Sequence, residues 1–162
     1  MKIKKIMAMM IAAVAVCVGF ASCGDDDEET VAVAQTLAGI YTGELSTTVM
    51  GSESKDKATY EIKMIDDTHV SITTPAAGSG AMALPSITVN NIPVTTSVVN
   101  GSEVVSASID KVSGTVTVNG AEKAYTFSDV VIVNSGSKVS ITYSLQYGKM
   151  PVAMVSSFTG NK

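Results

Sequence analysis

Downstream of residue 36, apolar and polar residues alternate with a period of two, and turn-forming residues interrupt the alternation about every ten positions. This alternation is typical of β-strands that have one face in a core and the other in water. The segment Val139–Tyr147 shows it most clearly, because every odd-numbered residue in it is apolar. The pattern predicts an antiparallel sandwich or barrel.

Local signals mark turns and irregularities between these strands. Residues 58–64 and 69–74 alternate on either side of Asp66-Asp67, which predicts a hairpin. Asn119-Gly120 predicts another, because this dipeptide accepts the two positive φ angles of a type I′ turn. Pro93 predicts an edge or bulged strand, since proline donates no hydrogen bond to a ladder. Counted together, about nine short strands are expected in 36–162, enough for one closed or nearly closed sheet.

The first 22 residues have the layout of a signal peptide. Three lysines in the first five residues precede an apolar stretch of about fifteen, followed by Ala21-Ser22. This stretch is shorter than the roughly 20 residues that span a bilayer as a helix. The sequence Phe20-Ala21-Ser22-Cys23 resembles a bacterial lipobox, in which cleavage precedes a cysteine that is then lipidated. We therefore expect residues 1–22 to be cleaved and Cys23 to carry the membrane anchor.

The alternative is that Cys23 is an ordinary residue near an ordinary cleavage site. Cys17 is lost with the leader, so the mature chain would keep one unpaired thiol, which is unusual in a secreted protein unless the thiol is modified. Lipidation explains this odd cysteine. Acyl chains on one residue hold a protein on a membrane stably when two or three are present.

An acidic run follows the cysteine. Its members are Asp25, Asp26, Asp27, Glu28 and Glu29. Blocks of like charge stay solvated and extended, so residues 23–35 are predicted to form a flexible tether before a single domain at 36–162. The run also resembles the acidic export signal that places Bacteroidetes lipoproteins on the outer face of the outer membrane. Surface display is the expected location, and a periplasmic orientation is the alternative.

The charge balance excludes nucleic acid as a partner. The chain has a net charge of −4, and removal of residues 1–22 leaves eight lysines against 15 acids, a net charge of −7. The sequence contains no arginine, the residue best suited to bidentate capture of phosphate or guanine. From residue 36 onward the domain is nearly neutral.

No set of residues defines a reaction or a metal site. His69 is the single histidine, no Gly-x-Ser-x-Gly motif occurs, and one histidine with one lipidated cysteine is too few for zinc. Acids on the strands, such as Glu44, Glu61, Glu103 and Glu122, alternate with apolar neighbours and are expected to face outward. We therefore predict no catalytic residue, no metal and no cofactor.

Three segments carry a resemblance to a known family. They are Leu37–Leu45 at the first strand, Ile87–Val94 in the middle, and Ser157–Lys162 at the end. In these the chain resembles the calycin-like β-barrel family of Bacteroidetes lipoproteins. The resemblance implies an all-β fold, a single antiparallel up-and-down, lipocalin-like barrel of about eight to nine strands, and a lipid-anchored envelope location. It implies no biochemical role, because a fold alone does not define one.

Two functional hypotheses follow, with an enzyme as a remote third. The first is a non-enzymatic, lipid-anchored envelope protein whose barrel binds a small apolar or amphipathic ligand. The alternative is a surface interaction or adhesion protein, or an accessory module of an outer-membrane complex, that binds an envelope partner through its outer face and loops. The residues expected to line a ligand site are Tyr60, Ile62, Met64, Ile141, Tyr143 and Leu145. Whether this interior is filled or hollow is left open by strand number alone.

Overall fold

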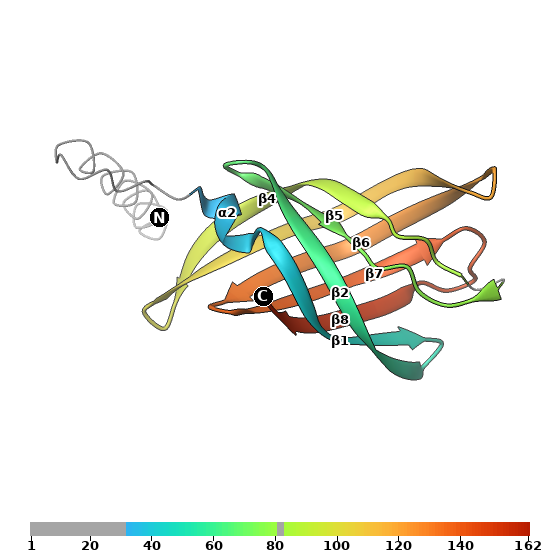
Figure 1. The fold of residues 1–162 in the computed structure, drawn as a ribbon, viewed down its shortest axis with the longest axis horizontal. Coiled ribbons are helices and arrows are strands. Elements are labelled where there is room, and N and C mark those ends of the chain that lie inside the picture. The colour runs from blue at the N-terminus through green and yellow to red at the C-terminus, as the bar shows by residue number, and fades with distance from the viewer. Residues whose placement is uncertain (1–31, 81–82) are drawn as a thin grey trace, which may run out of the picture. The chain divides into compact units, whose positions relative to one another are not determined.

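The alternating segments become eight antiparallel strands that pair in sequence order and close into one up-and-down barrel (Figure 1). The computed structural model describes residues 32–80 and 83–162. The strands are β1 (Gly39–Val49), β2 (Ser52–Asp66), β3 (His69–Thr73), β4 (Thr88–Val99), β5 (Ser102–Val118), β6 (Ala121–Ser135), β7 (Lys138–Tyr147) and β8 (Met154–Asn161). The predicted fold class is confirmed, with strand number at the lower end of the predicted range.

The alternation places every second residue of a strand inside the barrel. On β7, Val139, Ile141, Tyr143 and Leu145 are buried, whereas the residues between them face outward. Burial of a large apolar side chain contributes about 1.5–3 kcal/mol relative to exposure. The two-residue period read from the sequence is therefore the pattern that builds the core.

The hairpin turns have the predicted conformation. Asn119 and Gly120 have φ angles of 52° and 77°, which confirms the turn between β5 and β6. Asn100 and Gly101 adopt nearly the same angles, 52° and 79°. A third turn of this kind, at Met50-Gly51, was not predicted, because methionine rarely adopts a positive φ.

Pro93 lies where β4 changes partners. The β3–β4 register shifts beside Asn91, which has a φ of 58°. The β4–β5 ladder extends from Val99 back to Val94, which pairs with Ala107 and is the residue that follows Pro93. Beyond Ala107, β5 pairs only with β6 within the described part of the chain. The prediction of a bulged or edge strand at Pro93 is thus confirmed.

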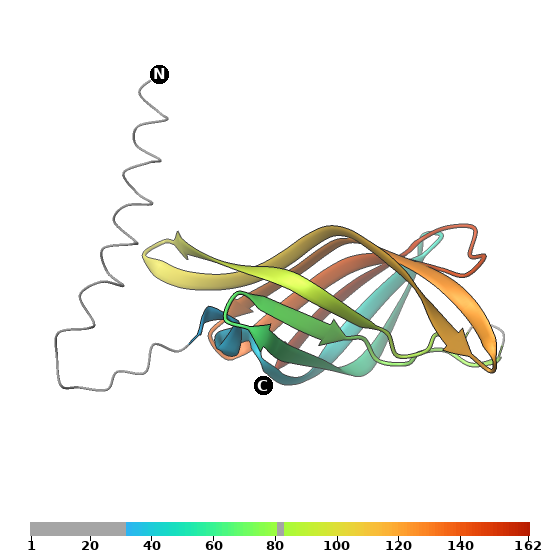
Figure 2. The ribbon, with the colours of Figure 1, turned by 90° about the horizontal axis from the view of Figure 1, so that it is seen from above.

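A short helix, α2 (Val33–Leu37), covers one end of the barrel (Figure 2), which we call the closed end. Ala34 and Leu37 are fully buried, and the Tyr41 hydroxyl donates a hydrogen bond of 2.9 Å to the Leu37 carbonyl. The Asn134 side-chain amide donates to the Thr36 carbonyl at 3.3 Å. The apolar side chains of α2, which begins before the expected boundary at residue 36, thus belong to the barrel core.

The opposite end, which we call the mouth, collects the other set of connections. These are the turn at 50–51, the loop 74–87, the turn at 119–120 and the loop 148–153. Figures 1 and 2 place all of them at the end of the barrel away from α2, as the alternating strand directions require.

The predicted signal peptide (1–22), Cys23 and the acidic run lie outside the described residues, so these predictions remain untested by the fold. In the ranges 32–80 and 83–162, no helix has the length and apolar character needed to cross a bilayer.

Candidate functional site

The mouth leads into a cavity of about 600 Å³, which we call the inner cavity. Its walls combine barrel residues with the loop 74–87. The barrel residues used below are Leu45, Asp56, Ala58, Tyr143, Leu145 and Met154. Most of these side chains are apolar, and the volume lies within the range of about 300–1,000 Å³ that is usual for small-molecule sites.

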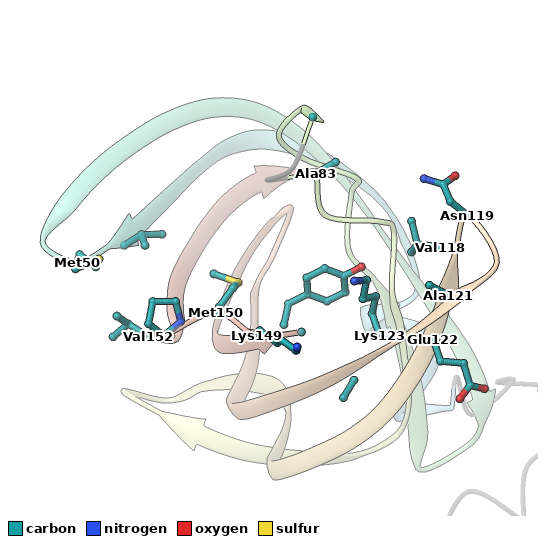
Figure 3. Close-up of a pocket in the computed structure, with 16 residues that line it drawn as sticks. Met50, Ala83, Val118, Asn119, Ala121, Glu122, Lys123, Lys149, Met150 and Val152 are labelled. Carbon is teal, nitrogen blue, oxygen red and sulfur yellow. The ribbon is translucent and has the colours of Figure 1, made fainter.

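A second, wider hollow of about 940 Å³ adjoins it, and we call this the outer cavity. Figure 3 shows its lining, with Ala83 and Asn119 on one side and Met50 and Val152 on another. Both cavities share Met150 as a lining residue, together with three others. The two hollows therefore form one route from solvent into the barrel.

Backbone hydrogen bonds hold the two long loops of the mouth. Within loop 74–87, the Thr74 amide donates to the Ile87 carbonyl at 2.9 Å, and Ala77 pairs with Leu84. The second loop is attached to β6 by the Gly148 amide, which donates to the Ala124 carbonyl at 2.7 Å. These hydrogen bonds fix the described parts of both loops to neighbouring backbone.

Tyr143 forms part of the floor of the inner cavity, and Tyr60 lies behind it in the core. The hydroxyls of Tyr60 and Tyr143 are 2.7 Å apart and share a hydrogen bond, and Tyr143 lines the cavity. Tyr60 packs against Phe158, and Tyr143 packs against Phe127, with ring centroids 4.5 Å and 5.3 Å apart. Burial raises the pKa of both phenols, and for Tyr60 the neighbouring Tyr143 raises the pKa further. Both hydroxyls are therefore neutral hydrogen-bonding groups at physiological pH.

Ser156 adds a third hydroxyl beside this pair. It stands opposite Tyr143 in the β7–β8 ladder and is only 1% exposed. Its Oγ lies near Tyr143 but has no partner with hydrogen-bond geometry in the described structure. Ser156 does not line the inner cavity, so its hydroxyl belongs to the packed core beside Tyr143.

The residues predicted to line a ligand site divide into three groups, of which the third, Met64, is described separately below. Tyr143 and Leu145 line the inner cavity. Tyr60, Ile62 and Ile141 face inward as predicted but are packed in the core and do not line that cavity. The barrel is accordingly filled toward the closed end and hollow toward the mouth.

Met64, the third group, does not line the inner cavity. It stands opposite the fully buried Val70 and so continues the inner face of Tyr60 and Ile62, but its side chain is 40% exposed. Met64 lies beside the β2–β3 turn at the closed end, where the barrel core ends.

The sequence reading missed most of the cavity lining, including Leu45, Ala58 and Met154. These residues belong to different strands and become neighbours only through barrel closure. A signal was nevertheless present. In an up-and-down barrel the first, third, fifth and seventh connections share one end, and two of these are the long loops 74–87 and 148–153.

His69 is paired with a carboxylate but has no catalytic geometry. Its Nδ1 lies 3.0 Å from Asp66 Oδ1 and 2.9 Å from the Thr68 hydroxyl, so both contacts use the same ring nitrogen. The Thr68 backbone N–H, followed by the His69 ring and the Thr68 hydroxyl, holds the pKa of Asp66 at about 2. This cluster stabilises the β2–β3 turn at the closed end, far along the barrel from the mouth.

The acids considered for catalysis lie at the surface; Glu103 has the phase of the buried Val105 and Ala107 but is exposed beside the β4–β5 turn. Glu44, Glu103 and Glu122 are exposed, and Glu61 pairs with Lys63 on the outer surface at 3.1 Å. Within the described ranges, no group of three or more His, Cys, Asp and Glu side chains has the arrangement of a metal site.

Comparison with known proteins agrees with this architecture. The family model of the calycin-like beta-barrel domain matches residues 37–161, so the chain belongs to the calycin-like β-barrel family. The predicted family resemblance is confirmed. This family model describes a fold and names no catalytic activity.

A crystal structure with a similar fold is that of a protein described as a putative outer membrane protein of Bacteroides fragilis. The TM-score is 0.60 at 23% sequence identity, and the match covers 82% of this chain and 54% of that protein. The present chain thus spans about half the length of that relative. No curated protein matches the sequence significantly.

Proposed function

We propose that this chain is a non-enzymatic envelope lipoprotein that binds a small amphipathic molecule through the mouth of its barrel. The observation that carries the proposal is the inner cavity of about 600 Å³, which has apolar walls and a hydroxyl-bearing floor. Apolar walls with a few placed polar groups are typical of small-molecule sites. This hollow favours ligand binding over the alternative, in which a filled barrel binds partners through its outer face.

The chemistry of the mouth supports binding rather than turnover. Catalysis needs a nucleophile, a base and a charge-stabilising group that converge on one point. The inner cavity offers the neutral hydroxyl of Tyr143 and the charged side chains of Asp56 and Lys57, and the His69–Asp66 pair lies at the closed end. These groups orient a bound molecule but do not form a reactive set.

A substitution that fills the inner cavity tests the proposal. Ala58→Phe places a ring in the hollow, and Thr59→Phe is the matched control, because Thr59 is the next residue and faces solvent. Fluorescence of the neutral apolar dye N-phenyl-1-naphthylamine is expected to rise with the wild type and with Thr59→Phe, and at least tenfold less binding is expected for Ala58→Phe. Equal binding by all three proteins, or none by the wild type, would contradict the proposal.

The location of the protein is part of the same proposal. Cys23 would carry the lipid anchor, and the acidic run Asp25–Glu29 would direct the protein to the cell surface. The description of the Bacteroides fragilis relative as a putative outer membrane protein supports an envelope location.

Fractionation of cells tests this location. Cys23→Ala is expected to release the protein from membranes, because Cys23 is the one thiol that remains after cleavage. Cys23→Ala protein that still sediments with membranes after salt and carbonate washing would show that the anchor lies elsewhere. Cleavage of the wild type by protease added to intact cells distinguishes surface display from a periplasmic orientation.

A further inference from the structure

The inner and outer cavities differ in charge, and this difference bears on the ligand. We propose that the mouth selects an anionic amphiphile, with a carboxylate held beside Lys123 and Lys149 and an apolar chain in the inner cavity. This inference rests on the proposed function, since it specifies the ligand class of the same site.

Lys123 faces the mouth because of its register on β6. It stands opposite Val116 of β5, and opposite residues of an antiparallel pair share one face. Val116 is half-buried and packs against the barrel core. Lys123 therefore lies on the inner face of the β5–β6 hairpin, where it lines the outer cavity (Figure 3).

The loop that follows β7 places Lys149 near Lys123 of β6. The hydrogen bond of 2.7 Å from the Gly148 amide to the Ala124 carbonyl fixes this loop against β6. The Cδ atom of Lys123 lies 4.0 Å from the position that a β-carbon on Gly148 would take. Figure 3 shows both lysine side chains at the centre of the opening, where Lys149 also lines the outer cavity.

Neither ammonium group is neutralised by the fold. Within the described ranges, Lys55 and Lys63 form ion pairs with Glu44 and Glu61, but no carboxylate lies within 4.0 Å of Lys123 or Lys149. The adjacent acid, Glu122, pairs with Thr117 on the outer face, and Figure 3 shows its carboxylate pointing away from the opening. Two lysines at the entrance thus remain available to an anion.

The inner cavity has the opposite preference. Asp56, an exposed residue in the mouth half of β2, lines it opposite Leu45, so a carboxylate that enters this cavity would meet a like charge. Lys57 also borders this cavity but pairs in register with Glu44 on the outer face of β2. The favourable orientation of an anionic amphiphile therefore has its head at the lysines and its chain among Leu145 and Met154.

Calorimetric titration of the mature chain with three probes of equal chain length tests the inference. The probes are dodecanoic acid, dodecanol and dodecylamine, at low salt and pH 7.5. An exposed lysine contributes modestly to an ion pair, so we expect the acid to bind about three- to tenfold more tightly than the alcohol. The amine should bind least. At 0.5 M salt the preference should shrink, because added ions screen exposed charges.

Two double variants identify the residues responsible. Lys123→Gln with Lys149→Gln should abolish the preference for the acid over the alcohol. Lys111→Gln with Lys138→Gln removes the same charge from positions that do not line either cavity and should retain the preference.

The outcomes separate the inference from the function on which it rests. Binding of the alcohol or the amine as tightly as the acid would overturn the anion preference and leave the ligand-binding function standing. A preference for the acid that persists in the Lys123/Lys149 variant would overturn the assignment of these two lysines. Failure of all three probes to bind would count against the proposed function itself.

Discussion

The two ends of this barrel are built from the same alternating strands, yet one is packed shut and the other is hollow. At the closed end, Leu37 of α2 is fully buried above Tyr41, which donates a hydrogen bond to its carbonyl. At the mouth, the loops 74–87 and 148–153 border cavities instead of covering the interior. The strands thus determine a barrel, and the connecting segments determine which end is accessible.

This difference separates stability from function along the barrel axis. Large apolar side chains such as Ile62 and Ile141 pack against one another toward the closed end. Toward the mouth, inward residues such as Ala58 are small or, like Asp56, polar, and they leave space. Substitutions at the closed end are therefore expected to affect folding, and substitutions at the mouth to affect binding.

The largest expected effect is at Leu37. Leu37→Ala removes a fully buried side chain and should lower the free energy of unfolding by about 2–5 kcal/mol. Leu84→Ala at the mouth, where the side chain is half-buried, should cost less than about 1 kcal/mol. Urea denaturation measures both. Equal losses in the free energy of unfolding for the two variants would contradict the distinction between a packed end and an open end.

The Tyr60–Tyr143 pair lies where the packed region meets the cavity. Tyr143→Phe leaves the Tyr60 hydroxyl without its partner at 2.7 Å and should destabilise the fold by about 1–3 kcal/mol. The double variant Tyr60→Phe/Tyr143→Phe should cost less than the sum of the single changes, because no hydroxyl is then left unpaired. Additive costs in a double-mutant cycle would show that the shared hydrogen bond contributes little.

A turn at the mouth should have a smaller effect. Gly120 has a φ of 77°, and nothing lies within 4 Å of the position that a β-carbon would take. Gly120→Val should therefore cost about 1–2 kcal/mol through backbone strain alone. Gly120→Asn, which tolerates a positive φ, serves as the control and should cost clearly less. An unchanged urea midpoint for Gly120→Val would contradict the turn geometry.

The smallest effect concerns the response of the closed end to acid. The pKa of Asp66 is lowered from 3.8 to about 2, chiefly by the Thr68 backbone N–H. A lowered pKa in the folded state stabilises the protein above the unfolded pKa, so this contribution is lost as pH falls from about 4 to about 2. NMR titration of the Asp66 carboxyl measures the shift directly.

Two asparagine variants test the assignment to Asp66. Asp66→Asn should weaken the dependence of the urea midpoint on pH in this range, whereas Asp67→Asn should retain it. An Asp66 carboxyl that titrates near 4 in the folded protein would show that the turn does not hold the charge.

Much of the fold was predictable because its signals are local. Alternation at Val139–Tyr147 indicated which residues face inward, and Asn119-Gly120 indicated a turn of known type. Pro93 indicated the irregularity in β4, because proline has no amide hydrogen to donate to a neighbouring strand. By contrast, the exposure of Met64 was not predictable, because it depends on how far the barrel core extends toward the β2–β3 turn.

The candidate site was only partly predictable, for a physical reason. Tyr143 and Leu145 were identified because they continue a visible alternation, but Ala58, Lys123 and Lys149 acquire their roles through contacts across strands. An inward position is a property of one strand, whereas a cavity depends on the volumes of all the side chains that meet there.

The sequence by itself determined the class of fold, the phase of the clearest strand, Val139–Tyr147, and the family to which the chain belongs. The tertiary structure decided that α2 covers one end, that the other end stays open, and that Tyr60 and Tyr143 meet in the core beside the inner cavity. The reason is the range of the interactions. Periodicity and turn chemistry act over a few neighbouring residues, whereas Tyr60 and Tyr143 are separated by 83 positions and meet only when the barrel closes.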